Sequence, residues 1–145
     1  RLTSGFTGNA NPITANWERD DTAGFGLLGT GMSESSGVFT FPSTGYWVVG
    51  FNSTFYGGDS ENQYVLSNIK VTTNNSSYAE GSASYDGVQG SNWTANASVT
   101  KMVDVTDTTN VKVQFGSISQ DDNHITNADT TVNYNYVTFI RLGDT

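Results

Sequence analysis

The chain has 145 residues, no cysteine, one histidine and a formal net charge of −8, from 14 acidic and 6 basic residues. This acidic balance argues against nucleic acid and anionic membrane surfaces as partners, because their phosphates demand a basic footprint. The absence of cysteine excludes disulfide frameworks and thiolate metal sites, and a single histidine excludes sites built from several imidazoles. No apolar run approaches the length of a membrane-spanning helix, so we expect no membrane insertion.

The sequence predicts an all-β sandwich of about nine to ten strands. Gly, Asn, Ser and Thr interrupt nearly every stretch, which disfavours helices and favours short strands joined by tight turns. We expect residues 1–12, which are polar and Gly-rich, to be a lead-in from a longer chain, and residues 13–145 to form one domain. The predicted strands cover 13–20, 24–32, 37–41, 45–56, 63–73, a short stretch around 77–84, 92–105, 111–119 and 131–143.

Two of these strands carry apolar side chains on both faces. In "YWVV" at 46–49 and "YVTFI" at 136–140, side chains that point to opposite faces are both apolar. An antiparallel strand in a lone soluble domain usually has one wet face. The residues expected to face the core from the first strand are Trp47, Val49, Phe51 and Phe55.

The second apolar face of each strand needs a cover, and no segment of the chain has a helical pattern that would supply one. We therefore expect this face to be buried against another copy of the chain, since exposed apolar patches usually mark interfaces. The alternative is that each strand is central and is covered by loops of its own chain. The side chains predicted at the interface between copies are Tyr46, Val48, Tyr134, Tyr136 and Ile140.

The stretch "GVFTFPSTGYWVVGFNSTF" at 37–55 resembles the signature of the globular head of complement subcomponent q, within the tumour-necrosis-factor-like jelly-roll superfamily. The stretches "VTDTTNVKVQF" and "NYVTFIRLGD" are similar to that family's penultimate and last strands. The resemblance implies an antiparallel jelly-roll β-sandwich that forms a homotrimer, with one sheet of each copy packed around the threefold axis.

A second resemblance spans nearly the whole chain. The stretches "NPITANWERDD", "GLLGTGMSESSGVFTFPSTGYW", "TTNNSSY" and "YVTFIRLGDT" are similar to a domain found at the C-termini of marine bacteriophage structural and tail-fibre proteins. This resemblance implies the trimerising tip of a fibre on the extracellular surface of a virion, where it would bind a host receptor or cell-surface glycan. The alternative is a purely structural module that trimerises a fibre or decorates a capsid.

The predicted ligand surface is a set of polar loops dotted with aromatic residues. Aromatic faces beside Asn, Asp and Gln suit sugar rings, through stacking and hydrogen bonds. The alternative for the aromatic members is that they cap the ends of the sandwich. The candidate ligand-binding residues are Asp59, Glu61, Tyr78, Tyr85, Trp93, Asp121, Asp122, Asn123 and His124.

We expect no cofactor, except that the superfamily resemblance makes calcium a candidate. Its ligands would be loop carboxylates, Asp121 and Asp122 above all, with Asp59 and Glu61 as further candidates. The alternative is that these are solvated loop charges.

We also expect no enzymatic activity. The triplet "GDS" at 58–60 and "DDNH" at 121–124 match blocks of a serine esterase family, with Ser60 as nucleophile and Asp121 and His124 as its partners. That family uses a parallel sheet with helices, which this chain does not predict. A surface-polysaccharide hydrolase would need two carboxylates flanking a sugar, and the sequence singles out no such pair.

Overall fold

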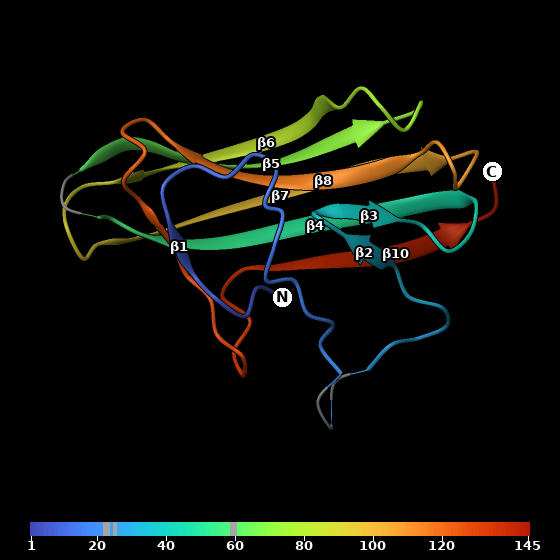
Figure 1. The fold of residues 1–145 in the computed structure, drawn as a ribbon, viewed down its shortest axis with the longest axis horizontal. Coiled ribbons are helices and arrows are strands. Elements are labelled where there is room, and N and C mark those ends of the chain that lie inside the picture. Colours follow the sequence, from blue (N-terminus) through green and yellow to red (C-terminus); the bar gives the residue numbers. More distant parts are fainter. Residues whose placement is uncertain (22–23, 25, 59–60) are drawn as a thin grey trace.

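The computed structural model describes residues 1–21, 24, 26–58 and 61–145. Within these residues, ten strands form two antiparallel sheets that pack face to face, with no helix (Figure 1). The predicted all-β sandwich is therefore confirmed. The strands are β1 (Phe6–Thr7), β2 (Ser33–Ser35), β3 (Val38–Thr40), β4 (Gly45–Tyr56), β5 (Asn62–Thr72), β6 (Ala79–Val88), β7 (Thr94–Val105), β8 (Lys112–Ser119), β9 (Ile125–Thr126) and β10 (Tyr136–Gly143).

Strand β4 lies at the centre of the first sheet. It pairs with β7 along one edge, and with β10 and then β9 along the other, while β1 extends the sheet beyond β9. The second sheet has the order β2-β3-β8-β5-β6. In the described part of the chain, no helix is long and apolar enough to cross a membrane.

The core consists of aromatic and β-branched side chains between the two sheets. Phe115 lies near its centre, with ring centroids 5.1 Å from Phe39 and 5.3 Å from Phe51. The four side chains of β4 predicted to face the core are all buried, as the alternation required. Val137 and Phe139 of β10 pack against the same cluster.

Residues 1–12 pack onto the sandwich: Leu2 is buried in the core, and Ala10 forms an isolated bridge with Ser117 of β8. Whether they lead in from a longer chain stays a prediction. The segments between residues 13 and 32 differ from the sequence-based expectations. The predicted strand 13–20 makes only an isolated bridge between Trp17 and Leu2, because Asn16 takes a left-handed conformation with φ of 65° that interrupts an extended chain.

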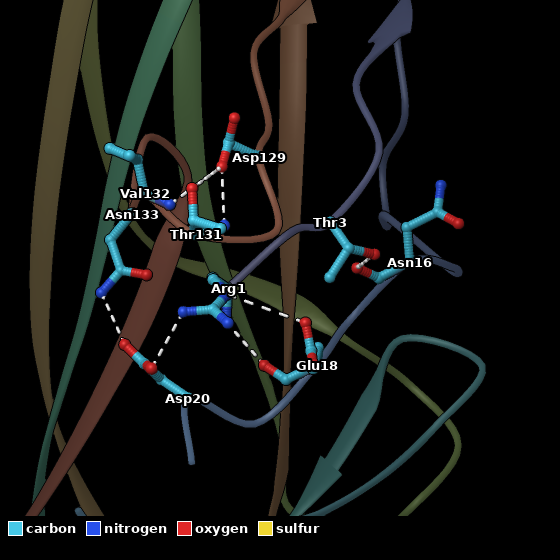
Figure 2. A network of polar contacts seen from close by, with 9 residues as sticks. All are labelled: Arg1, Thr3, Asn16, Glu18, Asp20, Asp129, Thr131, Val132 and Asn133. Atoms are coloured by element: carbon cyan, nitrogen blue, oxygen red, sulfur yellow. Dashed lines mark hydrogen bonds and ion pairs between the residues drawn. The ribbon is translucent and has the colours of Figure 1, made fainter. Parts of the chain in front are cut away.

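The predicted strand 24–32 is irregular over its described residues. A network of polar contacts holds the base of the segment that contains it (Figure 2). The Arg1 guanidinium donates to Asp20 at 2.9 Å, and the Asn133 amide donates to the other oxygen of Asp20, also at 2.9 Å. The Arg1 backbone exchanges two hydrogen bonds with Glu18.

Candidate functional site

The outward side of the first sheet carries an apolar row of side chains. Val48 on β4 lies directly opposite Met102 on β7 and Ile140 on β10, so the three side chains form a row across the sheet. Met102 and Ile140 are each 58% exposed. By strand alternation Tyr46 lies next to this row on the same side, and Tyr136 lies on that side beyond Thr138. We call these five residues the apolar face.

The structure brings together four of the five side chains expected at an interface between copies. Tyr134 lies apart from them, in the turn that precedes β10, where its backbone amide donates to Val132. Met102 was not predicted, although its place between inward-facing Lys101 and Val103 in an alternating strand would have indicated it.

One end of the sandwich gathers the loops that follow β4, β6 and β8 (Figure 1). The backbone amide of Gly57 donates to the carbonyl of Trp93 at 2.8 Å, and the Asn62 amide side chain donates to Asn123 at 2.7 Å. The backbone amide of Asp121 donates to the Asn62 side chain. The candidate residues at this end are therefore Glu61, Trp93, Asp121, Asp122 and Asn123, whereas Asp59 and Ser60 lie outside the described residues.

Tyr78 lies at the opposite end of the sandwich, just before β6 begins. There the backbone amide of Asn75 donates to Asn110, and Tyr78 is half-buried, which raises the pKa of its hydroxyl. Strand β6 runs the length of the sandwich between Tyr78 and the loop of Trp93, so these two aromatics cannot contact one small ligand.

Tyr85 is a strand residue rather than a loop residue. It lies on β6 and is 63% exposed, with its ring edge-to-face against Tyr64 of β5 at a centroid distance of 5.8 Å. Tyr64 and Leu66 alternate along β5 with Val65, which faces the core, and Tyr85 lies opposite Leu66. The two tyrosines therefore stand on the outward side of the second sheet. Tyr64 was not predicted at the site, because its pairing with Tyr85 depends on the register of two strands.

His124 lies inside the sandwich and not on its surface. Its ring is fully buried, with Nε2 2.8 Å from the Ser117 hydroxyl and Nδ1 2.7 Å from the Ser119 hydroxyl. Burial lowers its pKa from 6.5 to about 4, so the imidazole is neutral at pH 7. Because both ring nitrogens are held by serine hydroxyls of β8, His124 supports the loop from within and does not face exposed Asp121 as a catalytic partner.

The two main candidates for calcium, Asp121 and Asp122, are both exposed, at the end of the sandwich that carries Trp93. One oxygen of Asp122 accepts a hydrogen bond from the backbone amide of Asn9. Among the residues that the structure describes, no three acidic or histidine side chains gather as metal ligands. Calcium binding therefore stays a prediction from the family resemblance.

Neither a known family profile nor a curated protein matches this sequence. Among solved structures, the globular domain of zebrafish complement 1qA protein is similar, with a TM-score of 0.57 at 12% sequence identity. The match covers 97% of this chain and 98% of that one. It confirms the jelly-roll fold that the stretch at 37–55 predicted, and at this identity the likeness concerns the fold alone. The resemblance to bacteriophage proteins stays a prediction.

Proposed function

We propose that this chain is a self-assembling head domain that binds a host receptor or glycan at the tip of a bacteriophage fibre, on the surface of the virion. In the assembly, three copies pack their apolar faces around a threefold axis. The observation that carries the proposal is the row of half-buried Val48 and exposed Met102 and Ile140 on a sheet whose other side already forms the core.

Burial of the apolar face stabilises the assembly through the hydrophobic effect, at about 25 cal/mol for each Å² of apolar area removed from water. Large exposed apolar patches are rare on monomeric proteins and mark interfaces. The threefold symmetry and the place on a phage fibre rest on the two sequence resemblances.

The ligand-binding part of the proposal rests on the Tyr64–Tyr85 pair. Two partly exposed rings on a rigid sheet offer a platform on which a sugar ring can stack. The platform stands on the second sheet, opposite the apolar face, so assembly leaves it accessible. Trp93 and the polar side chains of the nearby loops supply further contacts for a longer glycan.

The assembly is tested by measuring the mass of the protein in solution. The expected result is a trimer for the natural chain, and a monomer for Ile140→Asp, because a carboxylate on the apolar face would be buried without a partner. Tyr85→Asp is the matched control, since it places the same charge on an exposed side chain of the opposite sheet, and it should remain a trimer. A natural chain that is monomeric at micromolar concentration would refute the proposed assembly.

Ligand binding is tested with a glycan array and with a competition assay on host cells. The folded natural head should bind a glycan and block adsorption of a phage that displays it, and Tyr85→Ala should lose both effects while remaining assembled. The same glycan should be recovered intact, without new reducing ends. If a saturating excess of the head bound no glycan and left adsorption unchanged, a purely structural trimerisation module would replace the receptor-binding proposal.

A further inference from the structure

We infer that the glycan bound by this head is a chain of acidic sugars, which lies along the outward side of the second sheet and places its anionic groups at Lys70 and Lys112. We call these two residues the lysine pair. The inference rests on the proposed function and adds to it the chemical class of the glycan and the residues that select it.

The lysine pair stands on the same side of the second sheet as the two tyrosines. Leu66 lies beside the tyrosines on the outward side, and alternate residues of β5 then bring Lys70 to that side. Lys112 of β8 lies directly opposite Thr72, the next outward residue of β5. At the usual rise of a strand, Lys70 stands about 13 Å from Leu66. A ligand that contacts both the tyrosines and the lysine pair is therefore an oligosaccharide rather than a single sugar.

Small and amide side chains lie between the tyrosines and the lysine pair. Asn68 lies directly opposite Ala83 on β6 and Gly116 on β8, and all three positions face outward. A Cβ atom at Gly116 would clash with the amide oxygens of both Asn68 and Asn11, so no larger side chain fits there. Asn11 is exposed, and its amide can hydrogen bond with the hydroxyls of a sugar that crosses this row. The path along the sheet is therefore not blocked by a bulky residue.

The outward side of this sheet is positive, although the whole chain carries −8. Of the residues of its five strands that point outward, the lysine pair and Glu80 are the charged ones, so two bases and one acid give +1. The other acids of these strands are turned inward, since Asp86 lies opposite core-facing Val65 and Glu34 lies opposite core-facing Phe39. A local positive charge beside the tyrosines favours an anionic ligand there.

The ammonium groups of the lysine pair have no ion-pair partner in the part of the chain that the structure describes. Lys70 lies directly opposite Glu80, but the Glu80 carboxylate accepts a hydrogen bond from the Asn68 amide at 2.9 Å instead. Both lysines are half-buried, so their stems rest against the sheet while their charged ends remain in water. Two such ammonium groups suit the carboxylates or sulfates of an acidic polysaccharide, and they give specificity for it.

The class of glycan is tested by titrating the assembled natural head with matched oligosaccharides. Oligogalacturonate is compared with its carboxyl-reduced form, and a sulfated galactan is compared with the same galactan after desulfation. We expect an acidic form to bind about tenfold more tightly than its neutral form, because the neutral form keeps the stacking but loses two ion pairs. The comparison that shows the preference distinguishes a carboxylate ligand from a sulfate ligand. Binding of the acidic form should weaken when the salt concentration rises from about 0.05 M to 0.5 M.

Substitutions test the lysine pair, and a lysine of the other sheet supplies the control. Lys70→Gln should weaken binding to the acidic glycan and to host cells about threefold, and Lys70→Gln with Lys112→Gln about tenfold. Lys101→Gln removes the same charge from β7 of the first sheet, so it should change neither. Glu80→Gln keeps an acceptor for the Asn68 amide but removes the acid from this side, so it should tighten binding. All four variants should keep the mass and melting temperature of the natural head.

Equal affinity for the acidic and neutral forms would overturn the inference and leave the proposed function standing. Host-cell binding that is unchanged without the lysine pair would do the same, and this measurement decides if neither set of oligosaccharides is bound. Single-stranded DNA bound as tightly as the acidic glycan would also overturn the inference, because the lysine pair would then serve nucleic acid. If the natural head bound neither glycans nor host cells, the proposed function would fail first.

Discussion

At the scale of single residues, His124 is the group whose burial has the clearest measurable effect. It is neutral and hydrogen bonded to two serines, and its pKa of about 4 lies below the ordinary value of 6.5. Protonation is therefore harder in the folded protein than in the unfolded chain. The stability that depends on the neutral ring is fully present above pH 6.5 and is lost as the pH falls toward 4.

We expect the free energy of unfolding to decrease by about 3 kcal/mol between pH 7 and pH 4 through this group, at about 1.4 kcal/mol per pKa unit. Urea unfolding at a series of pH values measures it. His124→Gln should be less stable at pH 7 but should lose most of the dependence between pH 6.5 and 4. An equally steep dependence in that variant would assign the effect to other groups.

At the scale of the elements, the turn into β4 depends on a glycine. Gly45 has φ of +128°, and a Cβ atom there would lie 2.2 Å from the backbone carbonyl oxygen of Gly143 at the end of β10. The close approach brings the start of β4 against β10, where the two strands pair. Only glycine combines this backbone conformation with this contact.

We expect Gly45→Ala to lower the free energy of unfolding by about 2–3 kcal/mol, through backbone strain and displacement of β10. Thermal or urea denaturation measures the change. Gly143→Ala is the control, because a side chain at that position meets no atom within 4 Å, and it should change stability by less than about 0.5 kcal/mol. Equal effects of the two substitutions would show that the contact does not matter.

The elements also show what the sequence could predict. Strand 45–56 was predicted with the bounds that the structure has, because a long alternating pattern determines both the strand and its faces. The two-residue strands β1 and β9 were missed, since so short a stretch has no period and forms only where a partner strand lies beside it. Conversely, 24–32 contains apolar residues but pairs with no strand over its described part.

The candidate site likewise has residues that the sequence could place and residues that it could not. Alternation alone placed Tyr46 with Val48, and Tyr136 with Ile140, on the outward side of their own strands, and the pairing of β4 with β10 joins the two sets. The pairing of Tyr64 with Tyr85 could not be predicted, because it depends on a β5–β6 register that contains two irregularities. The separation of Tyr78 from Trp93 could not be predicted either, because it depends on the direction of each strand.

At the scale of the whole molecule, the net charge opposes assembly. Each copy carries −8, so copies that approach one another repel, and dissolved salt screens this repulsion. We expect association to tighten when the salt concentration rises from about 0.02 M to 0.5 M. Sedimentation equilibrium at both concentrations measures the effect. Weaker association in high salt would indicate that attractive ion pairs, rather than apolar burial, hold the copies together.

The placement of the apolar face and the Tyr64–Tyr85 pair on opposite sheets also limits how an assembled head can meet a cell. If the apolar faces turn inward to the threefold axis, the three tyrosine pairs face outward, perpendicular to the axis and about 120° apart. A flat layer of glycans can then contact one or two of the tyrosine pairs at a time but never all three. Simultaneous engagement, and the gain in avidity that comes with it, requires receptors that surround the head, such as long polysaccharide chains into which it sinks.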